Sequence, residues 1–301
     1  MINTQRMLRS DRVCKALTGL RISEFQALVP TFEECLAAHR YMMKPIRKRR
    51  LGGGKKGALP TTADKLAYIL MYLKIYPTYD VMGFLTDRER GKCCESVQLL
   101  LPVLEMALGR KQALPKRKIT SADAFFRLFP QVKDVFVDGT ERRVQKPKNL
   151  KRRNKLYSGK KKATTRKTIV LSDDKKRILL MSPTKSGRRH DKRIADKFRI
   201  IDSVPQNVAI WVDTGFQGIQ SSHPNTVMPA KATKNNPLTE DQKQDNRVIS
   251  GVRILSEHAI GGIKRLRSAS DIYRNRLPNL DDTFNFLAAG IWNFHLQLAT
   301  Q

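Results

Sequence analysis

Apolar residues recur every three or four positions through roughly the first 45 residues, which is the spacing of an amphipathic helix. Phe25, Leu28 and Phe32 belong to this pattern. We expect Pro30 to break the helical stretch. A basic, glycine-rich connector follows at 46–57, and it is interpreted as a flexible linker that can also lie on DNA phosphates.

Three more helices are predicted before residue 110. The first begins at Thr61 or Thr62, a short one covers 78–85, and a longer one covers 90–108. This order is typical of a helix-turn-helix unit that binds DNA, although many small helical bundles share it. The residues nearest DNA would then be Arg88, Arg90 and Lys92.

The period of the apolar residues changes in the second half of the chain from that of helices to that of strands. Residues 132–138 alternate and predict a strand that Gly139 ends. Residues 167–171 and 177–181 predict a hairpin, and the apolar run 208–213 predicts a buried strand. Further elements are expected as a helix over 190–201, a short strand at 227–228, a long helix ending near 264 and a last helix over 280–298. Strands interleaved with helices predict an α/β domain.

The charge of the chain points to a polyanionic partner. Lys and Arg number 58 against 27 acidic residues, a formal net charge of +31. No apolar run approaches the length of a membrane span, and the first ten residues lack the apolar core of a signal peptide, so nucleic acid is favoured over a membrane. The four cysteines show no C-x-x-C spacing, which argues against a zinc site and suits a reducing compartment.

The strongest local concentration of charge lies at 146–162, with nine cations in seventeen residues. A run of this kind is often only a solvated surface. Leu156 and Tyr157 within it favour an ordered loop that binds phosphate.

Three acidic residues fall on separate predicted elements. Asp138 and Asp213 end two strands, and Glu257 lies on the long helix, four residues after Arg253. Each has an ordinary interpretation: turn residues for the aspartates, and a surface ion pair for Arg253 and Glu257. Together, in so basic a chain, they suggest carboxylates gathered around Mg²⁺ or Mn²⁺, and two such ions can cleave a phosphodiester.

Three stretches resemble the DDE transposases of the bacterial insertion-sequence-five group, which are related to the eukaryotic Harbinger transposases. Val137-Asp-Gly-Thr-Glu141 is similar to the first aspartate motif of these proteins, and Val212-Asp-Thr-Gly-Phe-Gln-Gly218 to the second. Arg253, Glu257 and Lys264 match the last three members of the group's Y-x2-R-x3-E-x6-K signature, whereas Ser250 stands at the tyrosine position.

The resemblance implies an α/β fold: a ribonuclease-H-like mixed sheet flanked by helices, preceded by an all-α helix-turn-helix domain. The expected divisions are an N-terminal helical region with the linker (1–57), the helix-turn-helix domain (58–118) and the catalytic domain (119–301). Asp138, Asp213 and Glu257 would bind two Mg²⁺ or Mn²⁺ ions. The residues expected to contact DNA, besides those named above for the helix-turn-helix, are Arg152, Arg153, Lys160, Lys161, Lys162, Arg253, His258, Lys264 and Arg265.

The activity implied is that of a DNA transposase. It would bind the terminal inverted repeats of an insertion sequence, cleave a strand and join the 3′-hydroxyl to target DNA. It would act as a homodimer or higher oligomer in the nucleoid-associated cytoplasm of a prokaryote. A catalytically retired DNA-binding descendant is the first alternative. A basic RNA-binding or ribosome-associated protein is the second, and it would need no acidic triad.

Overall fold

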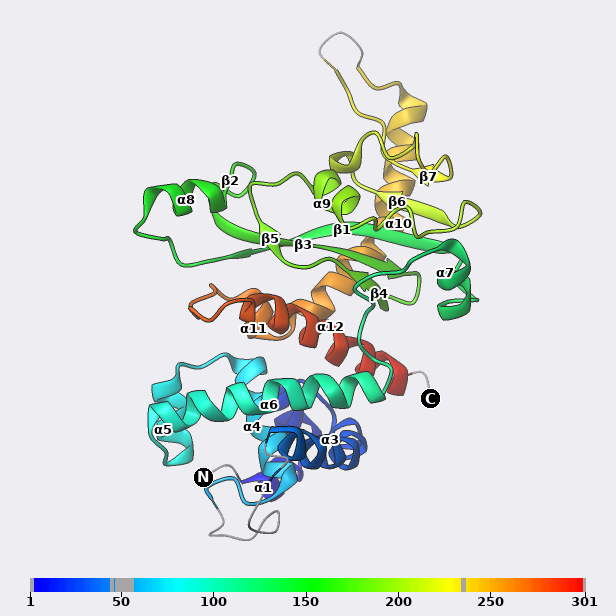
Figure 1. The fold of residues 1–301 in the computed structure, drawn as a ribbon. Helices are drawn as coiled ribbons and strands as arrows, with labels where there is room; N and C mark the ends of the chain where they lie inside the picture. Colours follow the sequence, from blue (N-terminus) through cyan, green and yellow to red (C-terminus); the bar gives the residue numbers. More distant parts are fainter. Residues whose placement is uncertain (1–2, 44–45, 47–56, 234–236, 300–301) are drawn as a thin grey trace. The chain divides into compact units, whose positions relative to one another are not determined.

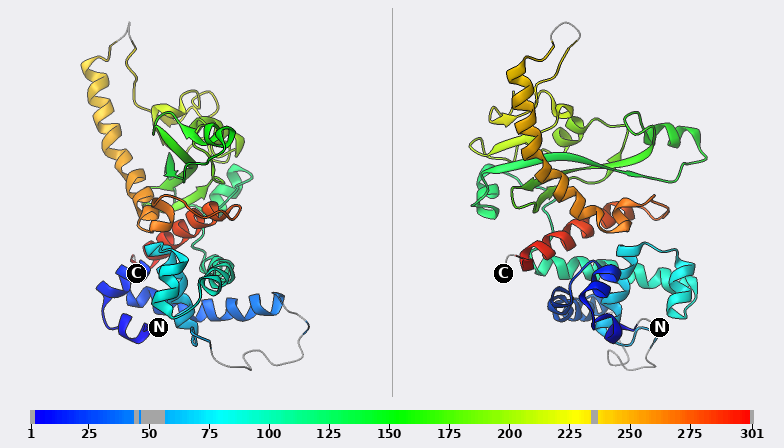
Figure 2. Two further views of the ribbon diagram at one scale, coloured as in Figure 1. Left: turned by 90° about the vertical axis from the view of Figure 1, so that its left-hand side faces the viewer. Right: turned by 180° about the vertical axis from the view of Figure 1, so that it is seen from behind.

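The computed structural model describes residues 3–43, 46, 57–233 and 237–299. Two compact units are present. The first contains Met1–Leu114, Lys264–Asp271 and Leu287–Gln301. The second contains Pro115–Ile263 and Ile272–Phe286. The ribbon is drawn in Figures 1 and 2, and each unit is described by itself below.

The first unit is built from helices. Their bounds are α1 Thr4–Met7, α2 Asp11–Thr18, α3 Ile22–Met43, α4 Thr62–Ile75, α5 Tyr79–Thr86, α6 Arg90–Arg110 and α11 Arg267–Ser270. The later part of α12 (Leu280–Ala299) joins them. A Cβ placed on Gly290 of α12 would lie 2.7 Å from Leu114 and 3.2 Å from Leu108, so glycine allows close packing there. The sequence had placed these segments in different predicted domains.

The predicted break at Pro30 is wrong, because α3 continues through it. Phe25 and Leu28 before the proline and Phe32 and Leu36 after it are all buried. Both halves of the helix therefore present one continuous apolar face to the core. Burial along that face offsets the backbone hydrogen bond that proline cannot make.

The three helices predicted between residues 61 and 110 are confirmed as α4, α5 and α6. Thr61 caps α4, accepting a hydrogen bond from the Asp64 N–H at 3.0 Å while Asp64 accepts one from the Thr61 N–H at 3.1 Å. Thr78 caps α5 by accepting a hydrogen bond from the Val81 N–H at 3.2 Å. Their assignment to a helix-turn-helix stays a prediction. The basic connector predicted at 46–57 lies outside the described residues except for its two end residues.

The second unit is built on a mixed sheet. Its strands are β1 Asp134–Arg143, β2 Tyr157–Ser158, β3 Ala163–Asp173, β4 Ile178–Met181, β5 Lys185–Ser186, β6 Ala209–Val212 and β7 Thr226–Val227. The order is β2-β3-β1-β6-β7, with β4 and β5 also paired to β3. Its helices are α7 Ala122–Leu128, α8 Leu150–Leu156, α9 Asp191–Lys197, the 3-10 turn η1 Thr214–Phe216, α10 Glu240–Lys264 and the first turns of α12. The predicted α/β mixed sheet and the hairpin of β3 and β4 are confirmed.

Two predicted boundaries are wrong. Gly139 does not end β1, which runs on to Arg143 because β3 continues to pair with it as far as Arg143 opposite Thr165. The helix predicted over 190–201 is confirmed only as the shorter α9, since Arg199 takes a left-handed conformation at φ 51°. The extension carries the antiparallel pair of β1 and β3 well beyond the core of the sheet (Figure 1).

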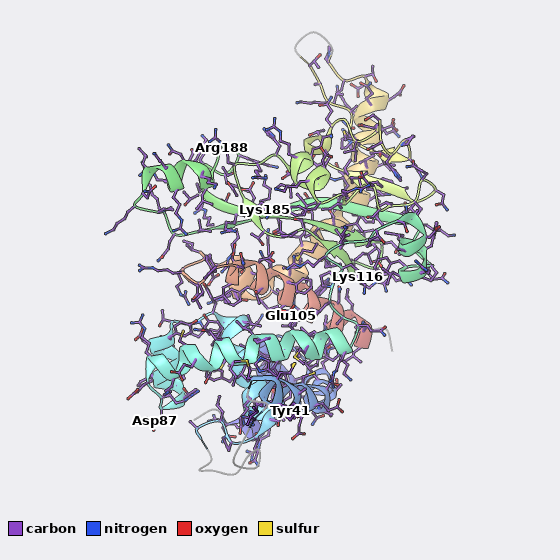
Figure 3. All side chains as sticks on the ribbon, viewed as in Figure 1. Tyr41, Asp87, Glu105, Lys116, Lys185 and Arg188 are labelled. Carbon is purple, nitrogen blue, oxygen red and sulfur yellow. The ribbon has the colours of Figure 1, made fainter. Side chains whose placement is uncertain are left out.

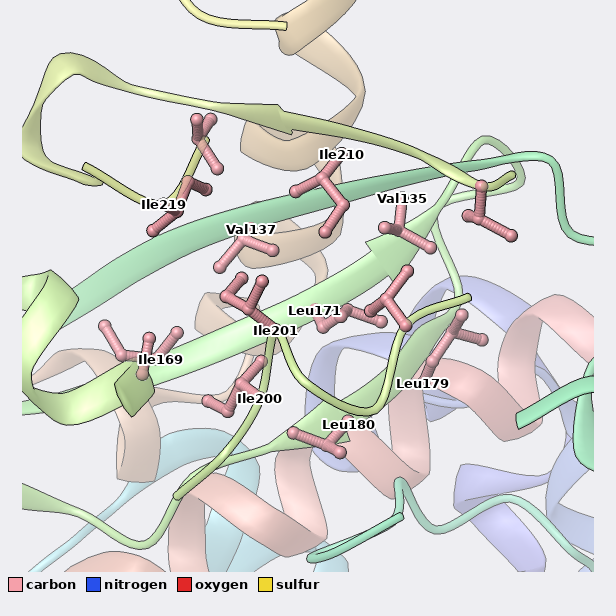
Figure 4. Close-up of a cluster of buried hydrophobic side chains, with 14 of the residues drawn as sticks. Val135, Val137, Ile169, Leu171, Leu179, Leu180, Ile200, Ile201, Ile210 and Ile219 are labelled. Atoms are coloured by element: carbon pink, nitrogen blue, oxygen red, sulfur yellow. The ribbon is translucent and has the colours of Figure 1, made fainter. Parts of the chain in front are cut away.

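The core of this unit lies on one face of the sheet. Because strand residues alternate between faces, Val135 and Val137 of β1, Ile169 of β3 and Ile210 of β6 point to the same side. The chain from α9 to η1, including Ile201, packs over them (Figure 4). The alternate residues point to the other face, where Phe136 stacks on Trp211. Figure 2 shows α10 running along that second face.

Candidate active site

The first two predicted acids lie side by side at the centre of the sheet. β1 and β6 run parallel, and Val137 pairs with Val212 in register. Asp138 and Asp213 are the next residue of each chain segment. Asp138 accepts a hydrogen bond from the Gly139 N–H at 2.6 Å, and Asp213 accepts one from the Thr214 N–H at 2.7 Å, which fixes both side chains locally.

The surroundings of Asp138 make its negative charge costly. Burial raises the pKa of this carboxyl above its ordinary value, and the nearby charges of Asp213 and Asp191 raise it further. The Gly139 N–H and Arg253 act in the opposite direction without cancelling the rise. Two neighbouring carboxylates, one of them largely buried, are an arrangement that a bound cation stabilises.

Helix α10 brings a positive charge to the aspartate pair. Arg253 Nη1 lies 3.8 Å from Asp213 Oδ1, and the arginine side chain is only 19% exposed. Glu257 follows one turn later on α10 and is exposed. Across the described residues, no group of three or more His, Cys, Asp or Glu side chains is arranged to hold a metal ion, so Glu257 is not gathered with the two aspartates.

The chemistry of the donors nevertheless suits a hard divalent cation. Asp138 and Asp213 offer carboxylate oxygens, which are the ligands that Mg²⁺ and Mn²⁺ prefer, and Glu257 would add another. The four-residue spacing from Arg253 puts Glu257 on the same face of α10. The residues present therefore fit such an ion, with Asp138 and Asp213 as its nearest pair of donors.

A buried ionic cluster supports β1 from the opposite side. Lys167 Nζ lies 3.0 Å from Glu141 Oε1 and 2.7 Å from Asp191 Oδ1, and it donates a hydrogen bond to the Arg189 carbonyl oxygen at 3.1 Å. The Lys167 side chain is 7% exposed. Asp191 also covers Gly139, since a Cβ there would lie 3.0 Å from Asp191 Oδ1.

This cluster was not predicted from the sequence, although one signal for it is present. Lys167 stands two residues before Ile169, in phase with the core face of β3, where a solvated lysine is not expected. Glu141 lies opposite it in register on β1. The wrong end assigned to β1 at Gly139 concealed that pairing.

The remaining predicted contact residues are distributed over several elements. Arg152, Lys160, Lys161 and Lys162 are exposed on the 146–162 segment, and Arg153 there is half-buried. His258, Lys264 and Arg265 are exposed, and Arg265 lies over the Trp292 ring.

The three cations of the predicted helix-turn-helix differ in their surroundings. Arg88 is held within the helical unit, donating to Ser96 Oγ at 2.9 Å and lying 5.9 Å from the Tyr68 ring centroid. Lys92 pairs with Glu95, and Arg90 is exposed. Arg90 and Lys92 are therefore both accessible, whereas Arg88 is engaged within the unit.

Comparison with known proteins identifies the class. The family model described as DDE superfamily endonuclease matches residues 137–289, just over half of the chain, and this stretch includes Asp138, Asp213 and Glu257. The chain belongs to that family. Its mixed sheet flanked by helices fits the ribonuclease-H-like domain of DDE enzymes.

A curated relative covers still more of the sequence. The probable transposase for insertion sequence element IS702 from Microchaete diplosiphon is 28% identical over 260 residues, which span 86% of this chain and 90% of the relative. No solved structure matches the chain. Among the helices of the described residues, none is long and apolar enough to cross a membrane.

Proposed function

We propose that this chain is the transposase of an insertion sequence of the insertion-sequence-five group, related to the Harbinger transposases. It binds double-stranded DNA at the terminal inverted repeats, cleaves a strand there and transfers the 3′-hydroxyl into target DNA. The observation that carries the proposal is the in-register pair Asp138 and Asp213 on β1 and β6, inside the stretch that matches DDE endonucleases. The 28% identity to a probable transposase for an insertion sequence element supports DNA as the substrate.

Each acidic residue has a role in this proposal. Asp138, Asp213 and Glu257 would hold two Mg²⁺ or Mn²⁺ ions, which supply activation of the attacking oxygen and stabilisation of the leaving oxygen. Arg253 offsets part of the charge of Asp213 and would meet a DNA phosphate beside the acidic pair. Lys264 in the first unit and the cations of 146–162 in the second would each add positive charge that draws DNA to the protein. The protein would act as a homodimer or higher oligomer on paired DNA ends, in the nucleoid-associated cytoplasm of a prokaryote.

The test is cleavage of DNA that carries the sequences flanking the gene, with Mg²⁺ present. Wild-type protein is expected to nick these ends and join them to a supercoiled plasmid. Asp138→Asn, Asp213→Asn and Glu257→Gln should abolish both steps and still bind the ends. Asp202→Asn is the matched control, because Asp202 forms only an exposed pair with Arg199 and should not affect cleavage.

Three results would overturn parts of the proposal. Strand transfer by any of the three acid variants would refute the role of that residue. Binding without cleavage by the wild-type protein would identify a catalytically retired descendant. Equal affinity for RNA and for the DNA ends would favour the RNA-binding alternative.

A further inference from the structure

The segment between β1 and β3, residues 146–162, folds back on its own hairpin; we call it the basic insertion. Val144 donates its N–H to the Thr164 carbonyl at 3.0 Å, which closes the stem of the hairpin. Tyr157 of β2 then pairs with Thr164 of β3. The Ser186 hydroxyl donates to the Lys155 carbonyl and fastens α8 to β5. The basic insertion is therefore an ordered part of the second unit.

A cavity of about 580 Å³ lies within this fold. It is lined by Lys146, Arg153, Asn154, Tyr157, Lys162, Ala163 and Thr164. We call it the insertion pocket. Its size falls in the range of pockets that take small organic ligands, about 300–1,000 Å³.

The lining combines positive charge with an aromatic ring. Among the described residues, no carboxylate lies within 4.0 Å of the charged nitrogens of Lys146, Arg153 or Lys162. The insertion itself contains nine cations and no acid. Tyr157 keeps 45% of its surface exposed although its backbone is held in a strand pair. The pocket therefore suits a ligand with both an anionic group and a flat ring.

We infer that the insertion pocket binds one unpaired nucleotide of the substrate DNA, with the base stacked on Tyr157 and the phosphate held by Lys146, Arg153 and Lys162. This inference rests on the proposed function, because it takes DNA as the substrate. Stacking requires a base whose face is free, which a paired base inside a duplex does not offer. The cations that do not line the pocket, such as Lys148 and Lys151, remain available for duplex phosphates.

The position of the pocket separates it from the reacting phosphate. Val144, at the stem of the pocket, is six residues beyond Asp138 along one continuous chain. At about 3.3 Å per residue this is roughly 20 Å, or about six base steps of B-DNA. The nucleotide held there is thus not the scissile one. Lys185 and Arg188, which Figure 3 labels, lie on the segment that Ser186 fastens to α8, and of the two Arg188 is exposed.

The inference is tested by DNA binding in EDTA, so that cleavage plays no part. Two probes are compared: a blunt duplex, and the same duplex with a single-stranded tail carrying 2-aminopurine. Wild-type protein should bind the tailed DNA more tightly and quench the 2-aminopurine. Tyr157→Ala should weaken tailed binding by about 5- to 150-fold and remove the quenching, with blunt-duplex affinity unchanged. Tyr157→Phe should retain both properties, since its ring still stacks.

Two matched controls keep the test decisive. Phe126→Ala removes a partly exposed ring outside the pocket and should have no effect on either probe. Arg153 lines the pocket, whereas Lys151 lies on the same helix outside it. Arg153→Ala should therefore weaken binding of the tailed DNA more than Lys151→Ala does. An equal loss of both probes in Tyr157→Ala, or no loss of either, would overturn the inference. The proposed function is tested separately: it fails if the wild-type protein shows no metal-dependent cleavage of the DNA ends.

Discussion

Replacing Lys167 by Met removes the only cation of the buried cluster behind β1 that is formed by Lys167, Glu141 and Asp191. In the wild-type protein, Lys167 Nζ holds Glu141 Oε1 at 3.0 Å and Asp191 Oδ1 at 2.7 Å. Methionine fills nearly the same volume, so the change mainly tests charge. It leaves two carboxylates facing each other, and the Glu141 side chain is 6% exposed.

The expected cost is large for a single substitution. Breaking a buried ion pair from one side costs about 3–5 kcal/mol of unfolding free energy, because the remaining charge is uncompensated. For a unit of this size, each kcal/mol lowers Tm by about 2–4 °C, so the second unit should melt roughly 6–20 °C earlier. The side chains are too deeply buried for the small values of surface pairs to apply.

The pKa of Lys167 determines how its contribution to the free energy of unfolding changes with pH. Burial alone would lower the pKa of Lys167, but its hydrogen bonds and charge contacts with Asp191 and Glu141 outweigh burial and leave the pKa above the usual lysine value. A cation with a raised pKa stabilises the fold fully below its unfolded pKa, about 10.4, and loses that contribution only as pH rises through the folded value. The wild-type contribution is therefore constant between pH 5 and 9.

In Lys167→Met the uncompensated carboxylates prefer protonation. The variant should then recover part of its lost stability as the pH falls from 8 toward 5. Thermal and urea unfolding at both pH values measure this. Lys192→Met is the matched control, because it removes a lysine from an accessible pair with Asp196 and should change stability by less than about 1 kcal/mol. A Lys167→Met protein as stable as Lys192→Met at pH 8, or one that loses stability on acidification, would refute the reasoning.

Three further predictions use glycines and a cap. Gly139→Ala places a Cβ 3.0 Å from Asp191 Oδ1, so it should displace that carboxylate and slow DNA cleavage by about 10- to 100-fold, as single-turnover assays would measure. Thr61→Ala removes the capping box of α4 and should cost about 1 kcal/mol in urea unfolding. Gly261→Ala adds a methyl group inside α10 that meets nothing within 4 Å beyond its chain neighbours and its own helix backbone, and it should stabilise by about 1 kcal/mol. Unchanged cleavage in the first variant, or unchanged unfolding in either of the others, would contradict the corresponding prediction.

The elements of this fold were largely predictable from local patterns. The capped helix at Thr61 and the alternating strand before Asp138 carry their signals within a few residues, so both were found. The continuation of α3 through Pro30 depends on core burial along the whole helix. The extension of β1 past Gly139 depends on a partner strand more than twenty residues away in sequence. Neither of these tertiary effects leaves a strong local pattern.

The sequence predicted that Asp138, Asp213 and Glu257 gather in one site. The structure sets the two aspartates side by side and, among the described residues, does not group Glu257 with them. Asp138 and Asp213 are neighbours because β1 and β6 are parallel and in register, and that pairing cannot be obtained from either strand alone. Lys167 and Asp191 were missed because their importance arises from burial. The insertion pocket depends on β2, a strand of two residues, which is too short for any periodicity.

Cleavage of the protein backbone by bound Fe²⁺ would test the central claim most directly, which is that Asp138 and Asp213 together bind divalent metal. Fe²⁺ with ascorbate and peroxide generates radicals that cut the chain next to the bound ion. The fragments should end near residues 138 and 213, should disappear with excess Mg²⁺ and in Asp138→Asn, and should persist in Asp202→Asn. The same fragments in Asp138→Asn, or cuts confined to other parts of the chain, would contradict it.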